Sequence, residues 1–147
     1  MTSFDEFITY KELLLKDLCS RLNTKLVCSI YRTDDEGIGY RDEILHGYCK
    51  GDIWYEFYFR EDCSICIGNV SKIKPYLFPL SSMTEEQRKE LFYLSGIDII
   101  DGKFYTNNEF TLDETLSGIN WLLKNHFDIN GLIPIGLANN ADRLNIY

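Results

Sequence analysis

The stretch Lys74-Pro-Tyr-Leu-Phe-Pro-Leu-Ser-Ser-Met-Thr-Glu-Glu-Gln-Arg88 separates a half of the chain with the patterns of strands from a half with the patterns of helices. Pro75 and Pro79 fix the backbone angle φ and lack an N–H donor, which predicts an extended connector rather than a helix or a central strand. Residues 84–87 (Thr-Glu-Glu-Gln) have the capping-box pattern, which predicts that a helix begins there. The apolar side chains of residues 76–80 are expected to anchor the connector to both halves.

The half before the connector has the pattern of one helix followed by strands. A capping box at Thr9–Glu12 and leucines at helical spacing, with charged residues between them, predict an amphipathic helix from about Tyr10 to Leu22. Residues 3–6 offer an alternative, earlier start. Four segments separated by turn residues then predict an antiparallel meander. These segments are Lys25–Arg32, Tyr40–Cys49, Ile53–Arg60 and Cys63–Ile67.

The half after the connector is predicted to contain two helices. The first runs from Glu85 to Leu94 and ends at Gly96, a residue that tolerates the left-handed conformation found after helices. The second begins at a capping box, Thr111–Glu114, and reaches about His126. Its apolar stripe comprises Leu112, Leu116, Ile119, Leu123 and Phe127.

Two segments of this half have weaker patterns. Residues 97–110 contain Asp101-Gly102 between apolar pairs and fit either a small hairpin or an ordered loop. Residues 128–147 combine glycines and a proline with apolar residues, which favours an irregular tail docked on the body. The predicted fold is therefore α+β, with an N-terminal helix, a four-stranded antiparallel meander, two further helices and a docked C-terminal tail. At this length a single domain, residues 1–147, is expected.

The composition excludes several classes of protein. The chain has 15 Lys+Arg against 23 Asp+Glu, a net charge of −8, and its basic residues are scattered, so nucleic-acid binding is not expected. The N-terminal residues lack the order of a signal peptide and no apolar run is long enough to span a membrane, which predicts a cytoplasmic protein. The odd number of cysteines, five, favours reduced thiols over a disulfide framework.

Two motifs carry a resemblance to a known group of sequences. They are Lys74-Pro-Tyr-Leu-x-Pro-Leu-Ser-Ser-Met-Thr-Glu-Glu86 and Asn125-His-Phe-Asp-x-x-Gly-Leu-Ile-x-x-Gly-Leu-Ala138. The chain resembles, in these motifs, a family of small proteins of gut anaerobic bacteria and of their phages and mobile elements. The likeness also touches residues 10–22 and 136–147, but not residues 25–70. It implies a cytoplasmic protein, often encoded by a phage or mobile element, and transfers no activity, cofactor or catalytic residue.

The most specific candidate for a metal site combines His46 and Cys49 with Cys63 and Cys66. One imidazole and three thiolates would form a closed tetrahedral zinc site. However, the segment between the two pairs, Asp52–Arg60, would span roughly 30 Å as a single strand at about 3.3 Å per residue. We therefore expect no metal and no other cofactor, and favour small buried thiols within a sheet. The zinc-stapled module remains an alternative.

Catalytic residues are hard to assemble from this sequence. Its two histidines, His46 and His126, stand in no nucleophile motif. A protonated His126 is expected to interact with the C-terminal dipole of the predicted helix that begins at Thr111. The acidic residues Asp98, Asp101, Asp113 and Glu114 are only a weak carboxylate cluster, because two of them fall in the first turn of a capped helix. A non-enzyme is therefore predicted. A small-ligand-binding protein or an enzyme remains an alternative, which an apolar pocket holding either histidine beside a carboxylate would favour.

The aromatic segment Ile53–Arg60 provides the predicted interaction surface. Ile53, Tyr55, Phe57 and Phe59 lie on one face of this strand, whereas Trp54, Tyr58 and Arg60 lie on the other. Tryptophan, tyrosine and arginine, the residue types on this second face, are common anchors of protein interfaces. These observations predict a small acidic, non-catalytic binding protein, acting as an accessory protein of a phage or mobile element that binds or inhibits a host protein. Its acidity would suit a basic partner surface, including one that normally binds nucleic acid.

Overall fold

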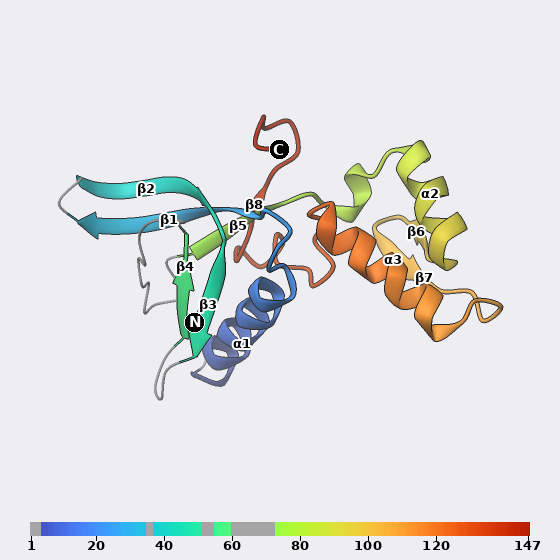
Figure 1. The fold of residues 1–147 in the computed structure, drawn as a ribbon, viewed down its shortest axis with the longest axis horizontal. Coiled ribbons are helices and arrows are strands. Elements are labelled where there is room, and N and C mark those ends of the chain that lie inside the picture. The colour runs from blue at the N-terminus through green and yellow to red at the C-terminus, as the bar shows by residue number, and fades with distance from the viewer. Residues whose placement is uncertain (1–3, 35–36, 51–54, 60–72) are drawn as a thin grey trace.

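The computed structural model of the protein describes residues 4–34, 37–50, 55–59 and 73–147. These residues form both helices and strands, so the chain is α+β as predicted (Figure 1). No helix among them is long and apolar enough to cross a membrane. In chain order the elements are α1 (Phe4–Ser20), β1 (Val27–Asp34), β2 (Gly37–Ile44), β3 (Gly47–Lys50), β4 (Tyr55–Tyr58), β5 (Ile73–Leu77), the 3₁₀ turn η2 (Leu80–Ser82), α2 (Glu85–Ser95), β6 (Asp98–Ile100), β7 (Lys103–Tyr105), α3 (Leu112–Lys124) and β8 (Asn139–Asn140).

The larger sheet has the strand order β2-β1-β5-β8 and not that of the predicted meander. β1 and β2 form an antiparallel hairpin from the pair Val27↔Ile44 to the pair Asp34↔Gly37. The predicted strand Tyr40–Cys49 is in fact two strands. After Leu45 donates its N–H to the carbonyl of Leu26, the chain leaves β1, and the N–H of His46 donates to Tyr58. β3 and β4 then form their own two-stranded sheet. The fourth predicted segment, Cys63–Ile67, lies outside the described residues.

The predicted connector contributes β5, which lies between β1 and β8 in the sheet. The prediction that Pro75 excludes a central strand is therefore wrong. Alternate residues of a strand direct their backbone groups to the same side. The carbonyl of Leu77 accepts from the N–H of Ala141 on the β8 side, so the N–H that Pro75 lacks would also point there. Pairing with β8 begins only at Tyr76, and the ladder loses no bond to the proline.

Two hydrophobic cores lie on opposite sides of this connector (Figure 1). The first, in what we call the N-terminal lobe, unites α1, the sheet strands and two residues of the tail, Leu132 and Ala138. The second, in the C-terminal lobe, unites α2, α3 and β6 with Leu80 of η2 and Phe127. Residues 125–138 therefore run from the end of α3 back to the first core. The single-domain prediction remains a prediction.

The local helix signals are confirmed in the C-terminal lobe. The Thr84 hydroxyl accepts from the N–H of Gln87 at 3.2 Å, and the Gln87 side chain accepts from the N–H of Thr84 at 3.0 Å. Thr111 and Glu114 form the same capping box at α3. Residues 97–110 contain the hairpin rather than a loop, because β6 and β7 pair antiparallel around Asp101 and Gly102, both at positive φ.

Candidate functional site

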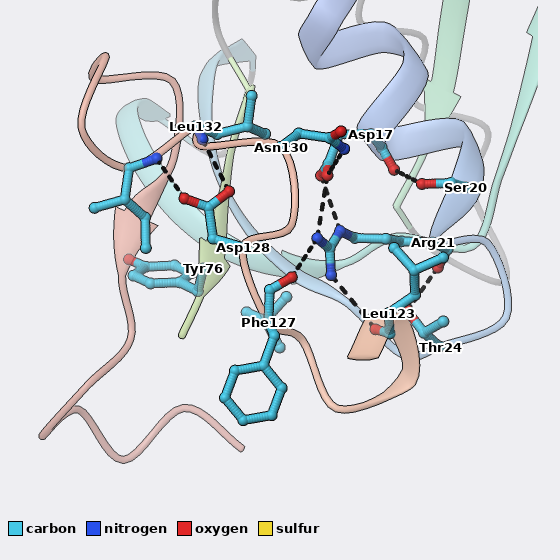
Figure 2. A network of polar contacts seen from close by, with 12 residues as sticks. Asp17, Ser20, Arg21, Thr24, Tyr76, Leu123, Phe127, Asp128, Asn130 and Leu132 are labelled. Carbon is cyan, nitrogen blue, oxygen red and sulfur yellow. Dashed lines mark hydrogen bonds and ion pairs between the residues drawn. The ribbon is translucent and has the colours of Figure 1, made fainter. Parts of the chain in front are cut away.

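A buried ion pair joins the two lobes. Asp17 and Arg21 lie one turn apart on α1, and both side chains are fully buried. The guanidinium of Arg21 donates to both carboxylate oxygens of Asp17, at 2.9 and 3.1 Å. It also donates to the carbonyl of Phe127 at 2.6 Å and to that of Leu123 at 3.4 Å (Figure 2). Arg21 therefore provides the cation at the C-terminal end of α3, where helix carbonyls lack partners.

Asp128 and Asn130 extend this network into the tail. The two carboxylate oxygens of Asp128 accept from the N–H groups of Leu132, at 2.8 Å, and Ile133, at 2.9 Å (Figure 2). The side-chain amide of Asn130 donates to Asp17 at 2.9 Å. Because these buried charges are all hydrogen-bonded within the protein, they position the chain and leave no group free for chemistry.

The sequence analysis did not predict this network, because it counted Asp17 and Arg21 among the charged residues between the leucines of an amphipathic helix. A signal was present, because Asp17 and Arg21 follow Leu14 by three and seven residues and so lie on its face of the helix. Leu14 is also buried, at 2% exposure. A pair of opposite charges one turn apart on an apolar face indicates a buried ion pair.

His126 directly precedes the residue that Arg21 contacts. Its ring stacks on that of Tyr147, with the ring centroids 3.8 Å apart, and the residue is only 8% exposed. Burial, with a smaller contribution from the charge of Arg21, lowers the pKa of His126 to about 4. The expectation that a protonated His126 interacts with the dipole of α3 is therefore wrong, because the ring is neutral at pH 7. Its Nδ1 atom is buried and has no hydrogen-bond partner within residues 4–34, 37–50, 55–59 and 73–147.

A pocket of about 450 Å³ lies against this histidine. We call it the His126 pocket, and its charged lining residues are Lys124 from α3 and Asp142 from the tail. Thr84 and Gln87 line it from the N-terminus of α2. The structure thus brings a histidine and a carboxylate to one pocket. The pocket is not the apolar one that would favour the small-ligand alternative, because Ser82 and Asn125 also line it.

The C-terminal lobe carries a second candidate site, an exposed apolar surface. Tyr93 on α2 is 89% exposed and Leu112 on α3 is 74% exposed. The predicted apolar stripe of α3 is therefore covered only in its second half. We define the C-lobe surface by its exposed large apolar residues, which are Phe92, Tyr93, Leu94, Ile100, Phe104, Tyr105, Leu112 and Leu116.

A groove of about 520 Å³ runs beside α2, and Phe92 and Tyr93 of the C-lobe surface are part of its lining. Arg88 of α2 forms two hydrogen bonds with Asp98 of β6, of 2.7 and 3.1 Å, and the guanidinium lowers the pKa of that carboxyl group. Phe92 meets the ring of Phe110 edge-on at 6.2 Å, and Gly96 is so close to Phe110 that any side chain there would collide with the ring. The ion pair between Arg88 and Asp98 and the ring contact between Phe92 and Phe110 therefore connect α2 to the other residues that line the groove.

Only one of the three predicted interaction residues, Tyr58, belongs to the described part of the chain. Trp54 and Arg60 are outside the described residues, and Tyr58 is half-buried on β4. The opposite face of this strand is buried as expected, since Phe57 and Phe59 are 0% and 1% exposed. The C-lobe surface was missed because helix periodicity shows which side of a helix is apolar, not how much of that side another element covers.

The predicted zinc ligands are not brought together in the described part of the chain. His46 is exposed before β3, and Cys49 lies in β3. Cys63 and Cys66 lie outside the described residues. Within those residues no group of histidine, cysteine and acidic side chains could hold a metal ion. The four-ligand zinc site therefore stays a prediction, whereas Asp98 and Glu114 are accounted for by an ion pair and a helix cap.

Comparisons with known proteins do not select between these sites. No family model, no curated protein and no solved structure matches the chain. The C-lobe surface and the His126 pocket are therefore the two candidate sites of the described residues.

Proposed function

We propose that the protein is a non-catalytic binding protein that uses the C-lobe surface to bind another protein. The observation that carries this proposal is the exposure of large apolar side chains on α2, β6, β7 and α3, led by Tyr93 and Leu112. Large exposed apolar areas of soluble proteins mark interaction sites, and aromatic residues supply much of the binding energy there. The groove beside α2 offers a preformed recess for a side chain of the partner.

The charges around this surface favour a basic partner. Among the described residues of this lobe, the exposed cations are Lys89, Lys103 and Lys124, and the exposed carboxylates are Glu85, Glu86, Glu90, Asp101, Glu109, Asp113 and Glu114. A lobe with more exposed carboxylates than exposed cations complements a partner with a basic surface. We therefore propose a cytoplasmic host protein with a basic surface, such as one that normally binds nucleic acid, and an accessory role for a phage or mobile element.

The test compares two double variants in affinity purification from a bacterial host lysate. Tyr93→Asp with Leu112→Asp places charges on the C-lobe surface, whereas Ile38→Asp with Tyr40→Asp makes the same kind of change at β2, where Ile38 and Tyr40 are 78% and 68% exposed. A partner that binds the wild type and the β2 variant, but not the C-lobe variant, supports the proposal. Its purified form should bind the C-lobe variant at least about tenfold more weakly.

Two outcomes contradict the proposal. Equal loss of the partner in both variants would show that the C-lobe surface is not specific. Sedimentation experiments that find a dimer of the wild type and a monomer of the C-lobe variant would show that a second copy of the chain covers this surface instead.

A further inference from the structure

We propose that the open edge of β7 binds an extended segment of the protein partner as a third strand, and that a neighbouring pocket receives an apolar side chain of this segment. The inference rests on the proposed function, because β7 belongs to the C-lobe surface through Phe104 and Tyr105. It adds which part of a partner this surface would recognise. Addition of a strand to an exposed sheet edge is a common way of binding a peptide.

The hairpin of β6 and β7 directs one pair of backbone groups outward. Residues 101–102 form its two-residue turn with both φ angles positive, and a turn of this type joins its flanking residues, Ile100 and Lys103, by hydrogen bonds. Bonded and non-bonded pairs alternate along an antiparallel ladder, so the residues of the next pair, Ile99 and Phe104, are not bonded to each other. The N–H and the C=O of Phe104 therefore point away from β6, toward the open edge.

The edge at Phe104 is free in the described part of the chain. β6 and β7 form a sheet of two strands there, and neither backbone group of Phe104 takes part in a hydrogen bond with another described residue. Exposed edges are usually protected by charges, prolines or bulges, but β7 has one charged residue, Lys103, beside two exposed aromatic residues. This edge is therefore suited to pair with another chain.

A pocket of about 460 Å³ adjoins the start of β7, and we call it the β7 pocket. Its apolar lining residues come from the connector, η2, β7 and the tail, and are Pro79, Leu80, Phe104, Ile129, Ile133 and Pro134. Because Phe104 belongs both to the open edge and to this lining, a segment that pairs with it has a neighbouring side chain at the pocket. Burial of an apolar side chain there would add to the binding energy of the backbone pairing.

Charges on both sides of β7 favour a basic segment. Asp101, in the turn before the strand, and Glu109, in the loop after it, are both exposed. The lobe as a whole has more exposed carboxylates than exposed cations. Lysine or arginine residues beside the apolar residue of the segment would therefore be attracted, and an acidic segment would be repelled.

The first test selects ligands for the full-length protein from a phage-displayed library of random peptides, and measures the affinity of the selected peptides by calorimetry. We expect peptides that combine an apolar residue with lysine or arginine and that bind with a dissociation constant below about 100 µM. Hydrogen exchange followed by NMR should show that a bound peptide protects the amide of Phe104 at least about tenfold. The proposal is overturned if no peptide reaches this affinity, or if the bound peptide leaves this amide unprotected.

The second test leaves the protein unchanged and methylates the backbone nitrogens of the selected peptide one at a time. Methylation of the residue that faces Phe104 removes the N–H that would donate to its carbonyl, so affinity should fall about tenfold or more. The two adjacent residues are the matched controls, because their N–H groups point away from β7. Equal losses at all three positions would overturn the proposal.

Two variants at one position test the pairing from the protein side. Phe104→Pro and Phe104→Ala both remove the aromatic ring, but only proline also removes the outward N–H, on which no bond of the hairpin depends. Phe104→Pro should bind the selected peptide at least about tenfold more weakly than Phe104→Ala, while NMR shows that the hairpin is retained. Equal binding by the two variants would overturn the proposal.

The variant that combines Tyr93→Asp with Leu112→Asp separates this inference from the proposed function, since neither residue belongs to β7 or lines its pocket. If this variant loses the lysate partner while the wild type selects no peptide, only the addition of a strand is overturned. If the variant keeps the partner, the proposed function is overturned, whatever the peptides show.

Discussion

Two polar regions adjoin Phe127, and they differ in whether their buried atoms are hydrogen-bonded. On one side, Arg21 donates to both oxygens of Asp17 and to two carbonyls. On the other side, the buried Nδ1 of His126 has no hydrogen-bond partner among the described residues. The first region is complete within the chain, so its role is to hold the lobes together. The second keeps a neutral, unpaired imidazole atom buried, so it is a site where acid should weaken the fold.

The largest effect on stability is expected when the buried ion pair of Asp17 and Arg21 loses its cation. Arg21→Met leaves the Asp17 carboxylate buried without its cation, so the free energy of unfolding should fall by about 3–5 kcal/mol. Urea denaturation followed by circular dichroism measures this change. Arg143→Met, at an exposed arginine in the tail, should change stability little.

A double variant separates the ion pair from the packing around it. Asp17→Leu with Arg21→Met removes both charges, so it should cost less than the sum of the two single changes. Strict additivity would show that the pair is not energetically coupled, and the contrast between the two regions would fail.

An intermediate effect on stability is expected from the buried, neutral His126 when the pH is lowered. In the unfolded chain His126 takes up a proton below its ordinary pKa of about 6.5, whereas in the folded protein its pKa is about 4. The unfolded state therefore binds more protons between these values, and stability falls as the pH falls. The loss from pH 7 to pH 5 should be about 2 kcal/mol.

His126→Gln tests the origin of this loss. Without the imidazole, the difference in unfolding free energy between pH 7 and pH 5 should shrink by that amount, measured by urea denaturation at both values. An unchanged pH dependence would show that the imidazole is not held neutral by its surroundings.

The smallest effect is expected from the charges of the pocket. Lys124→Gln and Asp142→Asn should each change the free energy of unfolding by less than about 0.5 kcal/mol, because both residues are exposed and unpaired in the described part of the chain. Thermal and urea unfolding of the two variants measure this. A loss comparable to that of Arg21→Met would place these charges in the architecture and not in a binding site.

Local signals in the sequence predicted the helices of the C-terminal lobe well, but the capping box at Thr9–Glu12 did not mark the start of α1, which begins at Phe4. The capping boxes at Thr84 and Thr111 and the stop at Gly96 were all correct, because each depends on residues within one helical turn. The apolar stripe of α3 was correct for Leu123, which is 8% exposed, but not for Leu112. The difference arises because the α3 stripe extends beyond the elements that cover it.

Partners distant in sequence were not predictable in the same way. Arg21 donates to a carbonyl 106 residues away, and β5 pairs with β1 and β8, which lie far before and after it. No local pattern specifies these partners. The His126 pocket is equally non-local, since its lining comes from α2, α3 and the tail.

By itself, the sequence determined the α+β class, the starts of both helices in the C-terminal lobe, the end of the first of them and the acidic character of the chain. These properties follow from hydrogen bonds within one turn, from hydrophobic periodicity and from composition. Only the tertiary structure decided that Pro75 could lie inside a sheet, that Asp17 and Arg21 are buried, and that His126 lacks a partner. Each of these depends on which distant backbone or side chain comes within hydrogen-bonding distance, and folding alone establishes that.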